Sequence, residues 1–504
     1  MSIRSTLGVL SIALASATSA LADIPPLWTA LFNEPGTLQD GAVQIVTDDA
    51  GAAYVVGTSQ VNGQLATQDL LALKYNADGS LAWSMRYDDP IGSQDIGADL
   101  ALASDGNLVV AGRVHGFGAG SQFGVIKIDS STGEIVWISA WDPASIDNPT
   151  SIAVDAEGGV FVAGESWGSE QSDFAVAKFN ANGELEWEQI YAGPGQFLFA
   201  HDRIDDIAID ANGDVFVTGP SNTAAHADMV TIKYDGTTGD EIWFQRYSPS
   251  PASDISSHIR LTPDGDVVIA GYEFQSDRVF SAVKYDGVTG DQQWVWTHNL
   301  GLRELTTGLA IDQLGDVYIT GSWDPDGDQS NNNYNSATFK IDGDTGAEIW
   351  LATYGTNGFN ERETPSDVEI DTNGNVWITG GDEGALFVIQ YDATNGAVIE
   401  TEFVFPGANQ FVGGNELTVD AAQNVYVVGG HRNYNTDETD VLVVKFPPQL
   451  EGGVSPADLN SDGLVNGADL AALLAQWNGV GEADINDDGV VDGTDLAQLL
   501  ASWS

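Results

Sequence analysis

The chain has 504 residues and no cysteine, and its 74 acidic residues far outnumber its 17 basic residues, for a formal net charge of −57. Such a charge repels phosphate backbones and anionic lipid, which argues against nucleic acid as a partner and against membrane insertion. Without cysteine the chain forms no disulfide, and any metal site must use oxygen or imidazole ligands.

Residues 1–22 have the form of a cleaved secretory signal. Arg4 precedes an apolar run at residues 7–15, and a small-residue motif ends at Ala22. We therefore predict cleavage after Ala22 and export, with the protein secreted or associated with the cell surface. No later apolar run is long enough to span a bilayer.

The body of the chain is a repeat of about fifty residues, which is plainest between Asp205 and Tyr247. The first half of this copy, DDIAIDANGDVFVTG, places two alternating apolar runs around an Asn-Gly pair at 212–213. The second half does the same around Thr-Gly at 238–239. Such pairs between apolar runs favour tight hairpins. One copy therefore predicts a four-stranded antiparallel unit, which is too thin to bury both of its faces alone.

Residues that recur at the same position of the repeat indicate that the chain contains eight copies. The glycine that ends the second run recurs about every 53 residues, at Gly57, Gly112, Gly164, Gly219, Gly271, Gly321, Gly380 and Gly429. Seven third runs carry the lysines of the chain: Lys74, Lys127, Lys178, Lys233, Lys284, Lys340 and Lys445. Six fourth runs carry a tryptophan: Trp83, Trp137, Trp187, Trp243, Trp294 and Trp350. In the seventh copy, Gln390 and Glu400 take these two places.

The eighth copy lacks a fourth run, and a matching segment stands at the other end of the chain. Residues 28–35 (WTALFNEP) correspond one by one to residues 83–90 (WSMRYDDP). A displaced strand that completes the last sheet suits a closed ring, because closure leaves fewer exposed sheet edges. We therefore predict an all-β fold, an eight-bladed β-propeller over residues 23–446 in which the N-terminal strand closes the last blade.

The charged and aromatic residues that recur in register are predicted to be structural. The first run commonly ends in an aspartate in phase with the lysine: Asp48, Asp155, Asp210, Asp312, Asp371 and Asp420. Burying an unpaired ammonium costs on the order of several kcal/mol, so we expect charge pairs within blades. We expect the tryptophans to be apolar plates wedged between adjacent blades.

Three runs resemble the tryptophan-docking motif of pyrroloquinoline-quinone-type propellers, which also have eight blades: KIDSSTGEIVW (127–137), KYDGTTGDEIW (233–243) and KIDGDTGAEIW (340–350). The whole unit, with its NGDVFVTG hairpin, is still more similar to the bacterial SBBP-type β-propeller repeat. Quinone-dependent members of the first family are longer and commonly carry a vicinal cysteine pair, which this chain lacks. The resemblance covers residues 27–446 and implies the architecture, and we infer no quinone enzyme from it.

The predicted topology separates short turns from variable loops. Turns between the first and second and between the third and fourth strands share one side, and the other connections share the opposite side. The variable loops carry aromatic residues: Phe117, Trp167, Phe274, Trp323, Tyr334 and Tyr434. We expect these rings to form a face that binds an extended ligand, such as a polysaccharide, by stacking. The alternative is that they only cover the rim of the core.

The repeat ends after Phe446, and residues 447–456 have the proline and glycine content of a linker. Residues 457–504 contain two twelve-residue loops with oxygen side chains at positions 1, 3, 5, 9 and 12 and glycine at position 6. Calcium takes six to eight oxygen ligands, and position 7 supplies a backbone carbonyl. We predict one ion per loop, Ca²⁺ in both, bound by Asp458, Asn460, Asp462, Leu464, Asn466 and Asp469 and by Asp484, Asn486, Asp488, Val490, Asp492 and Asp495.

Each loop leads into one apolar helix with no helix before it, so residues 456–504 resemble the type I dockerin module. That resemblance implies attachment to a cohesin-like protein or a cell-surface receptor. Dockerins of cellulase complexes usually place Ser or Thr at loop positions 10 and 11, followed by basic residues. Here those positions hold Gly467-Ala468 and Gly493-Thr494, and no Lys or Arg follows. The resemblance therefore supports calcium binding more strongly than it supports cohesin recognition.

Two classes of function remain. The first is a secreted, non-catalytic protein whose propeller presents a ligand face and whose tail attaches it to a partner. The second is a polysaccharide-degrading enzyme of the glycoside hydrolase class, or a component of such a complex, because dockerins often accompany these enzymes. Hydrolysis needs two carboxylates about 5 to 10 Å apart, and no departure from the repeat nominates such a pair. The sequence favours the first class, with no catalytic residue predicted.

Overall fold

The computed structural model describes most of the repeat region and parts of the tail. The described residues are 26–33, 37–61, 68–89, 92–117, 120–168, 171–195, 201–325, 333–355, 362–382, 384–406, 410–436 and 438–448, and in the tail 459, 467–477, 483, 491 and 496. They form thirty-two β-strands and one α-helix, so the predicted all-β class is confirmed for the repeat region.

Six sheets each contain four consecutive antiparallel strands. The first three are β6 (Ile96–Leu102), β7 (Leu108–Val114), β8 (Gln122–Ile128), β9 (Ile135–Trp141); β10 (Ile146–Val154), β11 (Val160–Trp167), β12 (Ser172–Phe179), β13 (Leu185–Tyr191); and β14 (Asp206–Ile209), β15 (Val215–Asn222), β16 (Ala227–Tyr234), β17 (Glu241–Tyr247). The next three are β18 (Ile255–Leu261), β19 (Val267–Phe274), β20 (Arg278–Tyr285), β21 (Gln292–His298); β22 (Leu302–Ile311), β23 (Val317–Asp324), β24 (Asn335–Ile341), β25 (Glu348–Tyr354); and β26 (Glu363–Ile370), β27 (Val376–Asp382), β28 (Ala385–Tyr391), β29 (Val398–Val404).

A seventh, eight-stranded sheet brings the two ends of the repeat region together. It comprises β1 (Trp28–Phe32), β2 (Thr37–Thr47), β3 (Ala53–Val61), β4 (Gln68–Tyr75), β5 (Leu81–Tyr87), β30 (Gln410–Val419), β31 (Val425–Asn433) and β32 (Glu438–Phe446). One parallel bridge between Gln39 and Thr439 joins β2 to β32. Strand β1 pairs antiparallel with β32, from Trp28 opposite Lys445 to Phe32 opposite Val441, which confirms the predicted pairing of the N-terminal segment.

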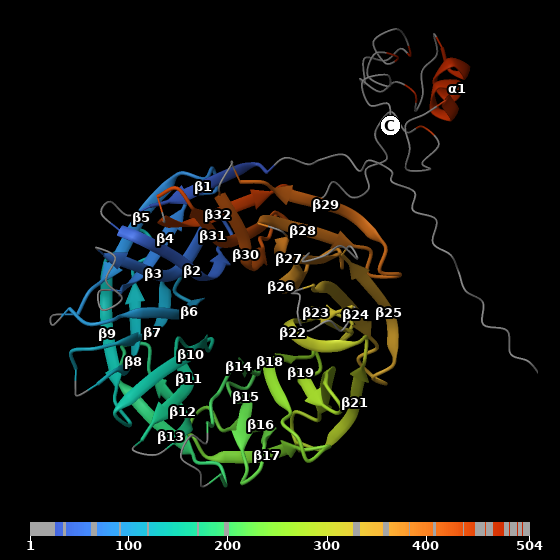
Figure 1. Cartoon of the computed structure of the whole chain (residues 1–504). Coiled ribbons are helices and arrows are strands. Elements are labelled where there is room, and N and C mark those ends of the chain that lie inside the picture. The colour runs from blue at the N-terminus through green and yellow to red at the C-terminus, as the bar shows by residue number, and fades with distance from the viewer. Residues whose placement is uncertain are drawn as a thin grey trace, which may run out of the picture.

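The sheets stand around a central opening, and the first strand of each four-stranded sheet lies towards it, as do β2 and β30 of the eight-stranded sheet (Figure 1). Core residues of adjacent sheets pack face to face. One such cluster joins Tyr54 and Leu70 of one sheet to Leu108 and Ile126 of the next. The described part of the chain therefore has a propeller-like fold, in which each thin sheet buries both faces against its neighbours.

The recurring lysine and tryptophan act together between sheets. The side chains of Lys233 and Trp243 both donate hydrogen bonds to the backbone oxygen of Gly287 in the next sheet, at 3.1 and 3.3 Å. The same double donation joins Lys74 and Trp83 to Ser130, Lys178 and Trp187 to Gly236, and Lys284 and Trp294 to Gly343. We call each such group a staple. The predicted position of the tryptophans between adjacent sheets is thereby confirmed.

The turn that receives each tryptophan requires glycine for two reasons. Gly290 adopts a φ of 75°, which side-chain-bearing residues rarely adopt, and a Cβ atom there would lie 2.8 Å from the Trp243 ring. The tryptophan of one sheet thus lies flat on the turn of the next. This explains why Thr-Gly recurs in the turn that precedes the fourth strand.

The predicted charge pairs are also observed. The ammonium of Lys233 lies 3.0 Å from Asp210 and 3.1 Å from Asp214. Where the first run does not end in aspartate, an acid two or four residues beyond the missing position takes its place. Lys127 pairs with Asp105 at 2.7 Å, and Lys284 pairs with Asp266 at 3.2 Å. These pairs let the lysines lie almost completely buried.

In the tail, α1 (Gly467–Ala475) supplies Leu473 to a small buried cluster with Ala483 and Val491. Asp469 lies in α1, and the other eleven predicted calcium ligands lie outside the described residues, as does the predicted signal. No helix among the described residues is long and apolar enough to cross a membrane.

Candidate functional site

The six aromatic residues predicted to form a ligand face all lie at the variable connections, but they do not gather in one place. Phe117 and Tyr434 are half exposed and lie in different sheets. Trp323 packs against the core of its sheet, and Trp167 makes an edge contact with His201 at 4.7 Å between ring centroids. Only Phe274 and Tyr334 line the same pocket.

That pocket has a volume of about 690 Å³ and spans three successive sheets. Its lining comes from the end of β19, the start of β20, the start of β22, the end of β23 and the residues before β24 and within β26. We call it the arginine pocket, and its lining residues are Phe274, Ser276, Asp277, Arg278, Arg303, Leu305, Ser322, Tyr334 and Thr364.

Arg278 forms one wall of the arginine pocket. Its guanidinium carbon lies 4.7 Å from the centroid of the Tyr272 ring, a cation–π contact. Asp277 accepts a hydrogen bond from the Arg278 backbone N–H at 2.8 Å. The Asp277 carboxylate is therefore engaged with the backbone rather than with the neighbouring guanidinium.

Arg303 also lines the pocket and has an unusual backbone conformation. Its φ of 56° lies in the left-handed region, which is uncommon for a residue other than glycine. Its Nη1 donates to the hydroxyl of Tyr334 at 3.4 Å. This hydrogen bond raises the pKa of Arg303 above its ordinary value, with smaller contributions from Tyr334, Asp324 and Asp277, so the side chain stays cationic.

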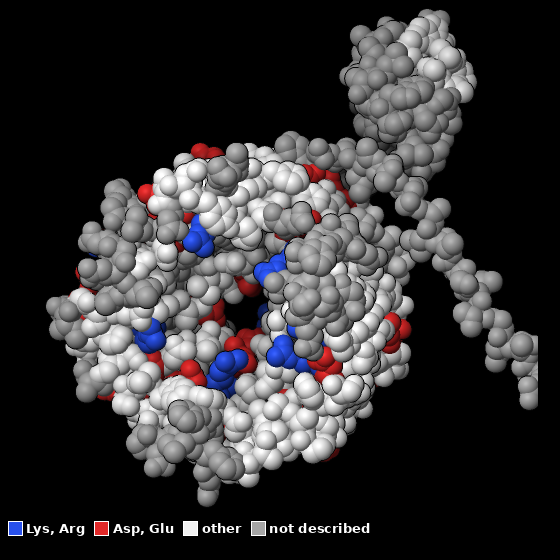
Figure 2. Space-filling model, viewed as in Figure 1, with Lys and Arg blue, Asp and Glu red and all other residues white. Residues whose placement is uncertain are grey.

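The seven lysines and eight of the nine described arginines lie on opposite sides of the ring. The ninth, Arg260, lies near the end of β18 and pairs with Asp206 at 2.8 Å. Every lysine stands near the end of a third strand, beside the short turns. Eight arginines stand where strands meet the variable connections: Arg86, Arg113, Arg203, Arg246, Arg278, Arg303, Arg362 and Arg432. Basic side chains stand around the central opening on the face that Figure 2 shows. The variable side of this acidic protein is thus its arginine-bearing side.

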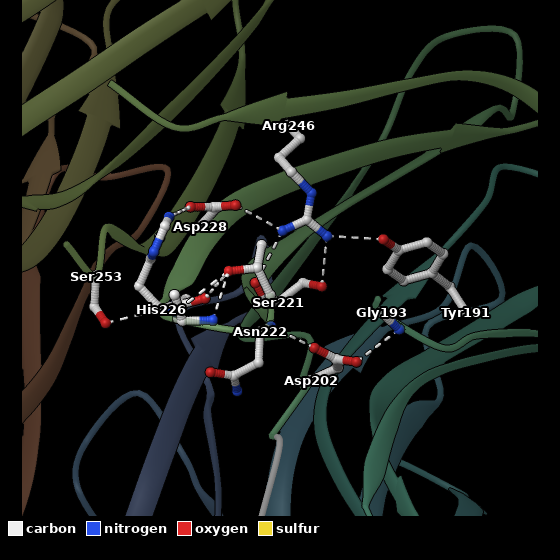
Figure 3. A network of polar contacts seen from close by, with 12 residues as sticks. Tyr191, Gly193, Asp202, Ser221, Asn222, His226, Asp228, Arg246 and Ser253 are labelled. Carbon is white, nitrogen blue, oxygen red and sulfur yellow. Dashed lines mark hydrogen bonds and ion pairs between the residues drawn. The ribbon is translucent and has the colours of Figure 1, made fainter. Parts of the chain in front are cut away.

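A second polar cluster on the variable side centres on Arg246 (Figure 3). Arg246 donates to Asp228 at 2.9 Å, to the Tyr191 hydroxyl at 2.9 Å and to Ser221 at 2.8 Å. His226 lies 3.1 Å from the other oxygen of Asp228. Tyr191 belongs to β13 and Arg246 to β17, so the cluster joins two sheets. The guanidinium of Arg246 binds all three of these partners within the protein, which indicates a structural role.

A buried acid also recurs where the chain enters several of the first strands. Asp202 accepts hydrogen bonds from the backbone N–H groups of Gly193 and Asn222, and it lies below the cluster in Figure 3. Asp95 does the same for Asp89 and His115, and burial raises the pKa of Asp95 to about 7. Asp89, Asp95 and His115 offer ligand atoms within 4.8 Å of one another. Because Asp202 makes the same two bonds without such a group of neighbours among the described residues, we assign Asp95 the same structural role.

Carboxylates also line the central opening. Asp99 accepts the N–H of Ile152 at 2.8 Å, and Asp367 accepts that of Leu417 at 3.0 Å, each from the following sheet. Burial raises the pKa of Asp99 to about 7 and that of Asp367 to about 6. These acids are held by backbone groups between sheets, which is a structural arrangement.

Arg278 and Arg303 were not among the predicted site residues, because the arginines, unlike the lysines, do not recur in register. The sequence nevertheless contains a signal for them. Eight arginines lie at the variable connections, where departures from a repeat are expected to carry function.

Comparisons with known proteins agree with the two parts of the chain. Residues 121–322 match a family described as outer membrane protein assembly factor BamB, and residues 456–501 match the dockerin type I domain. The search of curated proteins found no match.

Solved structures support the fold. The Dos1 propeller is similar at a TM-score of 0.55 and 12% identity, over 84% of this chain and 95% of that one. Sqt1 of Chaetomium thermophilum, bound to the N-terminus of the ribosomal protein L10, matches at a TM-score of 0.50 and 12% identity, over 82% and 100%. A europium-containing methanol dehydrogenase matches at 0.50 and 12%, over 84% and 93%. The chain therefore combines a propeller-like fold, part of which matches a BamB-type repeat family, with a C-terminal segment that matches the dockerin type I domain.

Proposed function

We propose that this is a secreted, non-catalytic binding protein: an eight-bladed propeller that presents a ligand face on its variable side and is attached to a partner through its tail. The observation that carries this proposal is the union of a propeller-like fold with a dockerin-type segment. The eight blades follow if the eight-stranded sheet is counted as two blades joined by the single bridge between β2 and β32. The signal at 1–22, the propeller at 23–446, the linker at 447–456 and the tail at 457–504 complete the proposed organisation.

The proposed tail binds two calcium ions. Dockerin type I domains bind calcium, and residues 456–501 match that domain. The two loops at 458–469 and 484–495 carry oxygen ligands at the required positions. A module of about fifty residues can bury little apolar surface, so ion binding contributes much of its folding energy.

The first experiment tests attachment. The full chain is passed over an immobilised type I cohesin in calcium and in EGTA, beside the variant Asp458→Ala with Asp484→Ala and a chain that ends at Pro448. We expect retention of the full chain in calcium alone. Equal retention of the full and truncated chains would contradict docking through the tail.

The second experiment tests the calcium assignment by thermal melting of the full and truncated chains with and without EGTA. We expect chelation to abolish only a minor transition that the truncated chain lacks. A single global transition lost in EGTA would instead place structural calcium in the propeller. Release of reducing sugar ends from polysaccharides by the purified chain would favour the hydrolase alternative.

A further inference from the structure

The arginine pocket presents a set of groups suited to one kind of ligand. It combines the guanidinium groups of Arg278 and Arg303 with the aromatic rings of Phe274 and Tyr334. Three hydroxyl side chains complete the lining: Ser276, Ser322 and Thr364. Its volume of about 690 Å³ falls within the range of small-ligand sites, roughly 300 to 1,000 Å³.

The charge of Arg278 is not neutralised as that of other arginines is. Arg86 lies 3.2 Å from Asp69, and Arg246 lies 2.9 Å from Asp228. Within the part of the chain that the structure describes, no carboxylate lies within 4.0 Å of the Arg278 guanidinium, although the chain carries a net charge of −57. Stacking on Tyr272 fixes the plane of this group at the pocket wall.

Arg303 carries a second sign of function. A left-handed φ is strained at a residue other than glycine, and such strain clusters at ligand sites. Asp277 and Tyr334 accept hydrogen bonds from the backbone N–H and the guanidinium of Arg303. One hydrogen bond therefore holds the strained backbone of Arg303, and the other holds its side chain in the pocket.

Building on the proposed ligand face, we propose that the arginine pocket binds a carboxylate-bearing sugar, a uronic acid residue within a polysaccharide chain. The planar guanidinium fork matches a carboxylate through two parallel N–H···O bonds. Phe274 and Tyr334 supply faces for the sugar ring, and the hydroxyl side chains supply partners for its hydroxyl groups. A chain with a denser charge, such as a polysulfate, meets stronger repulsion from the net charge of the protein.

The test is calorimetric titration of the full chain with tetragalacturonate and with its methyl ester, which removes the charge and keeps the sugar ring. The variants are Arg278→Gln, Arg303→Gly and their combination. Arg432→Gln is the matched control, because Arg432 also lies over a tyrosine ring on the variable side, 5.3 Å from the centroid of Tyr434. We expect the double variant to bind the free acid at least about tenfold more weakly and the control to bind it normally.

Two further readouts separate this role from a structural one. Arg303→Gly removes a strained side chain, so we expect an unchanged or higher melting temperature despite the loss of binding. Raising the salt screens the repulsion by the whole protein more than a close ion pair, so affinity for tetragalacturonate should hold or rise between about 0.05 and 0.3 M NaCl.

Other outcomes would overturn the assignment. If the methyl ester binds as tightly as the free acid and the double variant binds both normally, the ligand does not bind in the arginine pocket. The proposal of a ligand face would then still stand. If a sulfated oligosaccharide binds more tightly through the same arginines, the carboxylate class is wrong. If no oligosaccharide binds any form, the pocket assignment and the proposed ligand face both fall, whatever the tail does on cohesin.

Discussion

At the scale of single residues, the staple shows how a repeated side chain can serve two neighbours. One backbone oxygen, that of Gly287, receives a charged and a neutral donor at once. The ammonium of Lys233 also lies 4.7 Å from the centroid of the Phe216 ring. Ion pairs, a backbone oxygen and an aromatic face together compensate for the burial of the charge.

The staple predicts graded losses of stability at Trp243. Trp243→Phe keeps an aromatic plate on Gly290 and loses the hydrogen bond to Gly287, so we expect a loss of about 1 kcal/mol. Trp243→Ala also leaves a cavity, and we expect about 3 to 5 kcal/mol. Urea unfolding measures both.

Val288→Ala is the control, because Val288 is 79% exposed in the turn beside the staple. We expect it to change stability by less than about 0.5 kcal/mol. Equal losses for Trp243→Phe and Trp243→Ala would show that the hydrogen bond, rather than the plate, matters most.

At the scale of elements, one junction between the described sheets lacks both the recurring lysine and the recurring tryptophan. In β28 and β29, Gln390 and Glu400 stand where other sheets have lysine and tryptophan. The side-chain amide of Gln390 is fully buried, and both of its polar atoms lack hydrogen-bond partners among the described residues. Burial raises the pKa of Glu400 to about 7, and Glu402 adds to the shift. This junction is the one where the staple is replaced by a buried acid.

Glu400 should make stability depend on pH. Its folded pKa of about 7 lies above the ordinary value of 4.5, so the folded state prefers the protonated acid. The stabilisation is fully present below pH 4.5 and is lost as the pH rises through 7. We therefore expect Glu400→Gln to be more stable than the parent protein at pH 8 and to weaken the fall in stability between pH 4.5 and 7.

Urea midpoints at pH 4.5, 6 and 8 measure this effect for the parent, for Glu400→Gln and for Glu241→Gln. Glu241 is exposed at the start of a fourth strand, so it serves as the control. If both variants follow the parent curve at every pH, another group is responsible.

At the scale of the whole molecule, the N-terminal strand determines whether a sheet edge is left exposed. Trp28 of β1 donates to the backbone oxygen of Ala77 at 3.0 Å, and its ring lies on Gly79. The same strand pairs with β32 along five residues. This short segment therefore covers the edge of β32 and links β32 to the turn that follows β4.

Removal of residues 23–33 should expose the edge of β32. An unpaired, apolar edge strand templates association, so we expect lower stability and concentration-dependent aggregation. Light scattering during unfolding measures it, with Trp28→Phe as the control that retains the strand. A truncated chain that stays monomeric and as stable as the parent would contradict this role of β1.

The sequence predicted the architecture well because regular features of a repeat act locally and recur. Asn-Gly turns, alternating runs and in-phase lysines each appear many times, and the return of residues 28–32 follows from one missing run. The pocket was harder to predict from the sequence, because Phe274, Arg278, Arg303 and Tyr334 come from four different strand ends that only the fold brings together. Trp323 was predicted to belong to the ligand face. It packs instead against the hydrophobic core that its sheet shares with the preceding sheet.

The burial of the lysines has a practical consequence for handling the protein. None of the seven lysine side chains is exposed, since each has an ion pair within its sheet or a hydrogen bond to the next sheet, and the exposed basic side chains are arginines. Reagents that acylate primary amines should therefore react with the native chain at its amino terminus far faster than elsewhere. Coupling to a surface or a dye through that single amine would give oriented attachment, with the variable side left open to ligands.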